Sequence, residues 1–347
     1  MILEIQKTMR ALYYPAHNEL SLEDLPIPDY GENEVLVKVE ACGICGSEIE
    51  TFNSQSPRRV PPLVMGHEFS GVIQEVGTNV HGWLPGNKVV SNSIVSCGKC
   101  TNCINGKTNL CSGRQVFGMH RNGAFGAYVN VPATSLMSVP EGVSAKQACM
   151  AEPLANGIHL VKLTQHLSIK NVLVIGAGPI GLVAQQAFQA LRNANTIVSD
   201  IRTERLEVAK KLGAVGVINP LNSNVNEEIE NYTNGEPIDL VVDAVGNSET
   251  NKLGLSIVRP GGVLLIIGLH KNSNALYSYD IVLSEKSVMG SYAATQNDIE
   301  DAVALIASNE VDVSSWVNYY NLEDGKAAFY DMIQAKGSHI KSVIEFD

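Results

Sequence analysis

Residues 171–200 read NVLVIGAGPIGLVAQQAFQALRNANTIVSD, and this stretch decides the fold of half the chain. The apolar run Val172–Ile175 has the composition of a buried parallel strand. The motif G-x-G-x-x-G follows at 176–181, and Leu182–Leu191 continues with the spacing of a helix. A second apolar run covers Thr196–Ser199. The order strand, glycine-rich turn, helix and strand predicts a βαβ unit that binds a dinucleotide.

The three glycines of the motif and the acid that ends the second strand each have a role in such a unit. Gly176 makes the tight turn, Gly178 lets the backbone approach a pyrophosphate, and Gly181 lets helix and strand pack closely. The free N–H groups and positive dipole end of the helix attract the phosphates. Asp200 is positioned to accept from both ribose hydroxyls and would repel the 2′-phosphate of NADP. The stretch therefore predicts NAD.

The remainder of the chain falls into two patterns. Beyond Asp200 strand and helix runs alternate as far as Leu269, which predicts a parallel sheet with helices on both faces. From Arg10 to Val131, short runs broken by Pro and Gly predict an irregular β domain. Two amphipathic helices, Asp298–Ser308 and Leu322–Lys336, and a last strand, Lys341–Phe346, are expected to return to that first domain.

Length and charge limit the functions that the chain can have. A length of 347 residues predicts about two domains. The net charge of −11 argues against nucleic acid or an anionic membrane as the main partner. No apolar run approaches the roughly 20 residues of a membrane span, and the N-terminus MILEIQKTMR lacks the features of a signal peptide. We therefore expect a cytoplasmic protein.

Four of the seven cysteines lie close together, at Cys97, Cys100, Cys103 and Cys111. In a long chain without an export signal this spacing predicts metal binding rather than disulfides. Four thiolates suit a structural zinc in a closed site. An iron–sulfur cluster also uses C-x2-C-x2-C, but here the fourth cysteine is more distant and Ser112 follows it in place of proline.

A second metal signal is dispersed along the chain. It comprises Cys45 in CGICGSE, His67-Glu68 in MGHEFSG and Glu152 in AEPLANG. Each segment alone is weak, because a single cysteine or histidine is usually an ordinary core residue. A thiolate, an imidazole and a carboxylate together form a suitable ligand set for a catalytic zinc that keeps one position open for substrate.

These motifs, in this order, give the chain a resemblance to a known family. Glycine-flanked Cys45, GHE at His67, the four-cysteine loop, EPL at 152–154 and GAGPIG are similar to those of zinc-dependent medium-chain dehydrogenases/reductases. EPL resembles the polyol (sorbitol-type) branch. The resemblance implies a GroES-like catalytic domain over 1–152 and 289–347, with a zinc lobe at about 92–113. A Rossmann domain is implied over 153–288, with the active site in the cleft between the two.

The resemblance also assigns roles to residues. It implies that Cys45, His67 and Glu152 bind the catalytic zinc, and that Glu68 is a direct or alternating ligand or completes the shell through water. Ser47 is the hydroxyl that relays the substrate proton. The implied cofactors are two Zn²⁺ per chain and NAD. The residues implied to contact NAD, beyond the glycines and Asp200, are Ile180, Arg205, Ile267, Gly268, Leu269 and Ser291.

The implied reaction is reversible oxidation of a secondary alcohol to a ketone. The expected substrate is a polyol or sugar derivative, with or without a phosphate or acid group. Threonine and small diols remain alternatives. Ile94 stands where threonine dehydrogenases often have histidine, and this counts against threonine. Relatives form dimers or tetramers, so we expect a homodimer or homotetramer. A rival from another class is a non-enzymatic NAD-binding redox sensor, which needs no catalytic ligand set.

The chain departs from the family pattern at two positions near Ser47. Glu48 replaces the usual aspartate, and Glu50 replaces a histidine that relays protons in many relatives, so Glu50 is expected either to relay or to face solvent. Arg58-Arg59 suit either a solvated surface pair or a site for an anionic substrate group, and His120-Arg121 carry the same ambiguity.

Overall fold

The computed structural model describes residues 7–271, 277–334 and 339–347, and it divides into two compact units. The first unit comprises Met1–Glu152, Thr295–Ser308 and Val313–Asp347, and the second comprises Pro153–Ala294 and Asn309–Asp312. We expected the second boundary at 288/289. Strand β16 (Ser287–Gly290) pairs with the sheet of the second unit, which accounts for the later division at 294/295.

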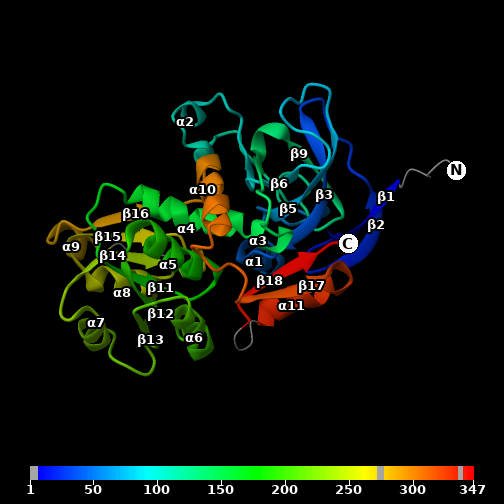
Figure 1. Ribbon diagram of the computed structural model, residues 1–347. Helices are drawn as coiled ribbons and strands as arrows, with labels where there is room; N and C mark the ends of the chain where they lie inside the picture. The colour runs from blue at the N-terminus through cyan, green and yellow to red at the C-terminus, as the bar shows by residue number, and fades with distance from the viewer. Residues whose placement is uncertain (1–6, 272–276, 335–338) are drawn as a thin grey trace. The chain divides into compact units, whose positions relative to one another are not determined.

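The second unit contains a six-stranded parallel sheet in the order β13-β12-β11-β14-β15-β16 (Figure 1). Its other strands are β11 (Asn171–Ile175), β12 (Asn195–Ser199), β13 (Gly216–Ile218), β14 (Ile238–Asp243) and β15 (Val258–Ile266). The predicted doubly wound α/β fold is confirmed. The apolar runs Val172–Ile175 and Thr196–Ser199 of the predicted βαβ unit lie in β11 and β12.

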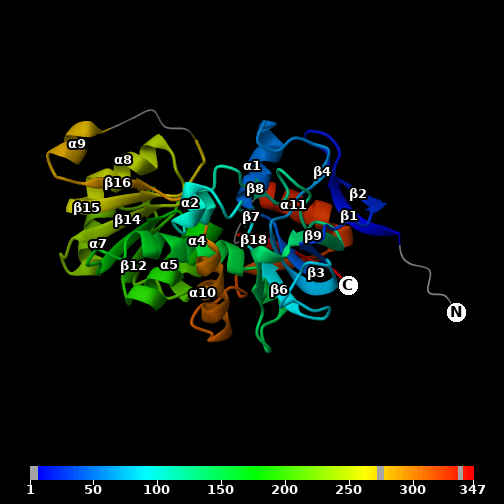
Figure 2. The same cartoon turned by 90° about the horizontal axis from the view of Figure 1, so that it is seen from above.

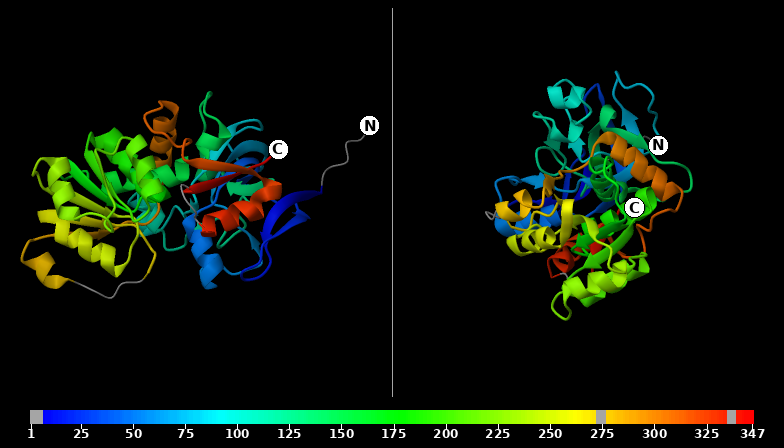
Figure 3. Two further views of the ribbon diagram at one scale, coloured as in Figure 1. Left: turned by 90° about the horizontal axis from the view of Figure 1, so that it is seen from below. Right: turned by 90° about the vertical axis from the view of Figure 1, so that its left-hand side faces the viewer.

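Helices lie on both faces of this sheet, as the views in Figures 1 and 3 show. They are α4 (Ala151–Leu163), α5 (Pro179–Arg192), α6 (Thr203–Lys211), α7 (Val225–Thr233), α8 (Ser248–Ile257) and α9 (Ser278–Val282). Every residue of β11 is buried because helices cover both of its faces. Helix α5 begins with Pro179, whose fixed φ suits the first turn, and ends at Asn193 in the left-handed conformation.

The first unit is rich in strands. Its sheets have the orders β2-β1-β4, β10-β6-β5-β3-β18-β17 with β9 paired to β3, and β7-β8. The strands are β1 (Thr8–Tyr14), β2 (Ser21–Pro26), β3 (Glu34–Gly43), β4 (Leu63–Val64), β5 (Glu68–Val76), β6 (Lys88–Ser91), β7 (Ile94–Val95), β8 (Gln115–Val116), β9 (Tyr128–Pro132), β10 (Leu136–Ser138), β17 (Val317–Asn321) and β18 (Lys341–Glu345). The predicted return of the C-terminal tail is confirmed, because β18 pairs with β3.

Short helices complete this unit. They are α1 (Gly46–Ser54), α2 (Thr101–Ile104), α3 (Ala145–Ala148), α10 (Gln296–Ala307) and α11 (Gly325–Gln334), with 3-10 turns at Thr108–Leu110, Ala133–Ser135 and Leu322–Asp324. Helices α1 and α11 lie side by side (Figure 2). Between them, the centroids of the Phe52 and Phe329 rings are 5.2 Å apart. The core beneath them gathers apolar residues from β1, β3, β5 and β9, such as Leu12, Val37 and Phe69.

Two predicted elements differ from those observed. The helix predicted over Leu322–Lys336 is a 3-10 turn followed by α11, and residues 335–338 lie outside the described part. The last strand of the β region predicted as far as Val131 begins at Tyr128 and continues to Pro132, since Gly126 only bridges to Ala11. A search of the described residues finds no helix with the length and apolar character needed to cross a membrane.

Candidate functional site

In the second unit, the glycine motif forms the turn between β11 and α5. Gly176 has a φ of +99°, which glycine adopts freely. A Cβ on Gly181 would lie 1.7 Å from the Gly176 carbonyl oxygen, so helix and turn pack without room for a side chain. A Cβ on Gly178, at the N-cap of α5, would meet only Arg205 Nη1 at 3.8 Å. That open space over the helix N-terminus is where an anion fits.

Asp200 follows β12 and faces this turn. Its carboxylate accepts hydrogen bonds from the Ala177 N–H at 2.7 Å and the Arg202 N–H at 2.8 Å. Both bonds fix the carboxylate beside the glycine turn. Burial lowers the pKa of the nearby Arg205, Asp200 opposes this shift, and the Arg205 Nε atom is buried without a hydrogen bond among the described residues.

The other predicted NAD contacts lie at the carboxyl ends of the same parallel strands, where ligands of such sheets bind. The backbone N–H groups of Ile267 and Gly268 both donate to the Asp243 carbonyl, and that of Ser291 donates to the Ile266 carbonyl. Ser291 Oγ is buried without a hydrogen-bond partner among described residues, and Leu269 is exposed. Ile180 lies in the first turn of α5.

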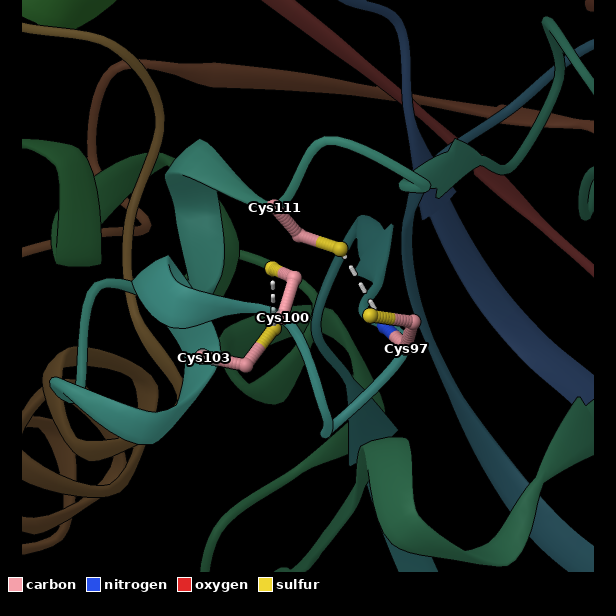
Figure 4. Close-up of side chains that lie close together, drawn as sticks. All are labelled: Cys97, Cys100, Cys103 and Cys111. Carbon is pink, nitrogen blue, oxygen red and sulfur yellow. Dashed lines mark hydrogen bonds between the residues drawn. The ribbon is translucent and has the colours of Figure 1, made fainter.

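In the first unit, the four-cysteine loop brings its thiols together. Figure 4 shows the side chains of Cys97, Cys100, Cys103 and Cys111 directed toward a common point, and their sulfur atoms all lie within 4.8 Å of one another. Cys97 N–H donates to Cys111 Sγ at 3.3 Å. Backbone N–H groups of Cys103 and Ser112 lower the pKa of Cys100 to about 5, which favours the thiolate. Four sulfur donors in this arrangement fit a tetrahedral zinc.

The dispersed segments also converge in the first unit. Ligand atoms of Cys45, His67 and Glu68 lie within 4.8 Å of one another. Cys45 is the N-cap of α1, and its Sγ accepts from the Ser47 N–H at 3.5 Å. His67 and Glu68 are buried where β5 begins. A sulfur, an imidazole and a carboxylate at this spacing fit a divalent metal.

Glu48 orients the histidine, a contact that the sequence reading did not assign. Glu48 is fully buried; its Oε1 lies 3.1 Å from His67 Nδ1 and accepts from the Gly66 N–H, while Oε2 accepts from the Cys45 N–H. Burial raises its pKa, but His67, Arg59 and the Cys45 N–H outweigh burial and lower it to about 2. The ionised carboxylate only accepts, so Nδ1 carries the proton and Nε2 is free to bind metal.

Glu68 is paired with a buried lysine from the last strand. Lys341 is 1% exposed, and its Nζ donates to Glu68 Oε2 and to the Ile44 carbonyl at 2.9 Å. Burial lowers the pKa of Lys341, and the charges of Glu68 and Cys45 outweigh burial and raise it. A Cβ on Gly43 would lie 2.2 Å from Glu68 Oε2, so the glycine leaves space for this pair.

Glu152 lies near this group without belonging to it. It is buried in the first turn of α4, and it interacts electrostatically with His67 and Glu68. Burial and then the Glu68 charge raise its pKa, while His67 and Ser93 oppose the shift. The group within 4.8 Å comprises only the other three predicted ligands among the described residues.

The structure distinguishes between the alternatives that the sequence left open for Glu50, for Arg58-Arg59 and for His120-Arg121. Glu50 faces solvent and pairs with exposed Arg58 at 3.0 Å. Arg59 is fully buried, so the expectation of a solvated arginine pair is wrong for this residue. Arg121 pairs with Glu34 at 2.7 Å, and His120 Nδ1 accepts from the Val116 N–H, so both stabilise the surrounding loop.

Comparisons with known proteins identify the family of the chain. Residues 31–141 match the alcohol dehydrogenase GroES-like domain, and residues 179–308 match the zinc-binding dehydrogenase family. Sorbitol dehydrogenase of Bacillus subtilis is 31% identical over 345 residues, and D-arabitol-phosphate dehydrogenase of Enterococcus avium is 32% identical over 349 residues; each match covers 98% of both chains. A structure described as a short chain alcohol dehydrogenase from Escherichia coli CFT073, complexed with NADH, has a TM-score of 0.91 and 29% identity, with 98% of this chain and 100% of that chain covered.

The chain belongs to the zinc-dependent medium-chain dehydrogenase/reductase family, in the branch of the polyol dehydrogenases. It is an oxidoreductase that acts on the CH–OH group of a small molecule and uses zinc and NAD. The prediction of an enzyme is therefore confirmed, and the rival of a non-enzymatic sensor is excluded.

Proposed function

We propose that the chain oxidises a secondary alcohol of a polyol or sugar derivative to a ketone, reversibly, at Cys45, His67, Glu68 and Glu152. The observation that carries the proposal is the convergence of the first three residues within 4.8 Å, with His67 and Glu68 buried and Cys45 half-buried. The proposed enzyme is cytoplasmic and is a homodimer or homotetramer, as expected from the resemblance.

The proposed chemistry divides between the bound groups and the chain. Zinc supplies Lewis acidity toward an alcohol oxygen, and nicotinamide accepts hydride. Ser47, in the first turn of α1, takes the proton of the substrate hydroxyl and passes it toward solvent. Glu48 holds His67 in the tautomer that leaves Nε2 free. Lys341 balances the charge of Glu68.

The proposed NAD site uses the glycine turn and Asp200. The α5 N-terminus binds the pyrophosphate over Gly178, with Ile180 beneath it. Asp200, fixed by two backbone N–H groups, accepts from the ribose hydroxyls and disfavours a 2′-phosphate, and Arg205 lies beside it. Ile267, Gly268, Leu269 and Ser291 line the nicotinamide.

The test is substitution of Cys45 with serine, because this removes one proposed ligand and leaves the second unit unchanged. We expect Cys45→Ser to lose turnover and one of two zinc ions while it retains NADH binding. The control is Cys149→Ala, which changes a buried cysteine outside both ligand sets and should retain both ions. Metal analysis and NADH fluorescence measure these outcomes, and a fully zinc-loaded, active Cys45→Ser enzyme would refute the proposal.

The substrate class is tested separately. Sorbitol and arabitol-phosphate are the substrates named for two relatives, which supports a polyol with or without phosphate. A screen of sugar alcohols, their phosphates, threonine and butanediol, followed by NADH absorbance, should give the highest kcat/KM with a polyol. Preference for threonine or a small diol would contradict this assignment.

A further inference from the structure

Arg59 is the largest fully buried side chain in the described part of the protein. It lies in the segment between α1 and β4. Its Nε donates to the Gly118 carbonyl at 2.5 Å, and its Nη1 donates to the Ser47 carbonyl at 2.9 Å and to Thr51 Oγ1 at 2.6 Å. Its Nη2 is buried without a hydrogen-bond partner among the described residues.

Stability alone does not explain an arginine at this position. Its three hydrogen-bond partners are neutral oxygens, and one N–H group remains unpaired. Burying a charge and leaving a donor unpaired both disfavour the folded state. The Glu48 carboxylate interacts with it electrostatically, but Glu48 itself holds Cys45 and His67. The buried Arg59 guanidinium, beside the proposed active site, therefore lowers the free energy of unfolding.

The contacts of Arg59 fix the backbone of Ser47. The Ser47 N–H donates to Cys45 Sγ at 3.5 Å, and its carbonyl accepts from Arg59. With both backbone groups held, the direction of the Cα–Cβ bond is set, and only χ1 remains to orient the hydroxyl. Thr51 Oγ1 also donates to the Ser47 carbonyl and accepts from Arg59, which closes a small network.

The hydrogen bond from Arg59 to the Gly118 carbonyl connects the arginine to the backbone just before His67. Gly118 has a φ of +65°, and a Cβ on it would lie 2.8 Å from the Gly66 backbone N. Gly118 therefore packs directly on the residue before His67. By donating to Gly118 and Ser47 at once, the guanidinium sets the separation of these two segments.

We propose that Arg59 is a positioning residue, which fixes the Ser47 hydroxyl relative to Cys45 and His67 by holding the Ser47 and Gly118 carbonyls in one guanidinium. The inference rests on the proposed role of Ser47 in the reaction. Lysine cannot replace Arg59 in this role, because a single ammonium lacks the planar set of donors that spans both carbonyls.

The test is a double-variant cycle on the zinc-loaded enzyme. Arg59→Lys should lower kcat by roughly tenfold or more, since small displacements of a reacting group have large effects on rate. KM for NAD and the zinc content should stay unchanged. In a Ser47→Ala background the same substitution should lower kcat by less than about twofold, because coupled residues are not additive. The matched control is Arg58→Lys, the same change at an exposed neighbour, which should leave kcat unchanged.

A second measurement is independent of activity. Peptides that cover α1 should exchange amide hydrogens faster in Arg59→Lys than in the unaltered protein, and Arg58→Lys should show no increase. Unchanged exchange, unchanged kcat, or equal effects of Arg59→Lys with and without Ser47 would each overturn the inference. Full activity of Ser47→Ala would instead refute the proton relay of the proposed function. If Arg59→Lys fails to fold, Thr51→Val takes its place in the same cycle, with a smaller loss of kcat expected.

Discussion

At the scale of single residues, the proposed active-site group is surrounded by buried charges, and the sequence indicated a role for only one of them, Glu68. Glu48, Arg59, Glu68 and Lys341 are all buried, although charged residues are seldom found inside unless they are paired. Lys341 comes from β18, far along the chain from Glu68 in β5. The pair therefore connects the C-terminal strand to the proposed metal ligands.

In the zinc-free protein, Lys341→Met should strongly destabilise the first unit, since it leaves the Glu68 carboxylate buried without any cation beside it. Breaking one side of a buried pair lowers the free energy of unfolding by about 3–5 kcal/mol. Adding Glu68→Gln should recover part of this loss, as no uncompensated charge then remains. Urea denaturation of the single and double variants measures both effects, and equal stabilities of the two would count against a charge-based origin.

The pair also illustrates what the sequence could and could not predict. Cys45, His67 and the four-cysteine loop belong to short motifs, and the structure brings Cys45 and His67 together with Glu68, although Glu152 lies outside that group. Lys341 lies in HIKSVIEFD and Arg59 in SPRRVPP, neither of which is a recognisable motif. Both act through tertiary contacts with residues that are distant in sequence, and only the fold brings these together.

At the scale of elements, the glycine turn before α5 has two roles that can be tested separately. Gly181 allows close packing of helix and turn, and Gly178 is proposed to let the cofactor approach the backbone. Gly181→Ala should lower the melting temperature, because its Cβ would lie 1.7 Å from a backbone oxygen that cannot move freely. Gly178→Ala should keep the melting temperature, because its Cβ meets only Arg205 at 3.8 Å. The same Gly178→Ala protein should bind NADH at least roughly tenfold more weakly, since the methyl group would occupy the path of the pyrophosphate.

Thermal unfolding and NADH fluorescence, measured on both variants, test this assignment. Full NADH affinity in Gly178→Ala would show that the backbone at this position does not approach the cofactor. An unchanged melting temperature in Gly181→Ala would contradict the close packing of helix and turn.

The junction of β3 and β9 should make stability depend on pH. Glu34 accepts hydrogen bonds from Arg121, Asn130 and the Gly31 N–H. Burial raises its pKa, but these donors outweigh burial and lower it below the ordinary value of 4.5. The stabilisation is thus complete above about pH 4.5 and is lost as the pH falls through the lower, folded-state pKa. Glu34→Gln should remove this dependence at a loss of about 1 kcal/mol near pH 7.

Melting temperatures of the two proteins from pH 3 to pH 7 check this expectation. The curves should converge toward the acid end, because the unaltered protein then loses the contribution that the variant lacks. Parallel curves would contradict it.

The elements that were predicted well share one property. Strands β11 and β14 contain the continuously apolar, buried runs Val172–Ile175 and Leu240–Val242, so composition alone indicates them. Strand β16 was not predicted, because Ser287, Val288 and Gly290 are exposed at the edge of the sheet and carry no apolar period. Helix α4 was not predicted either, although EPL lies in its first turn, because its residues are mostly buried on every side.

At the scale of the whole molecule, the two units carry separate chemistry. The glycine turn and Asp200 lie in the second unit, and both cysteine-containing groups lie in the first. Repeated βα patterns predicted the second unit closely, because neighbouring strands of its sheet are consecutive in the chain, apart from the β11–β14 pair. The first unit takes strands from both ends of the chain, so its sheet order could be anticipated only through the family resemblance.

The four-cysteine lobe provides the last prediction. Between Cys97 and Cys111 the chain forms only α2 and a 3-10 turn, while Ile104 and Leu110 are exposed, so the lobe has little apolar core of its own. Metal binding must then supply most of its stability, as in other small metal-bound loops. Cys103→Ser should release one zinc per chain and make this loop sensitive to limited proteolysis, while NADH still binds to the second unit. Retention of two zinc ions together with an uncleaved loop would mean that the thiols do not hold a structural metal.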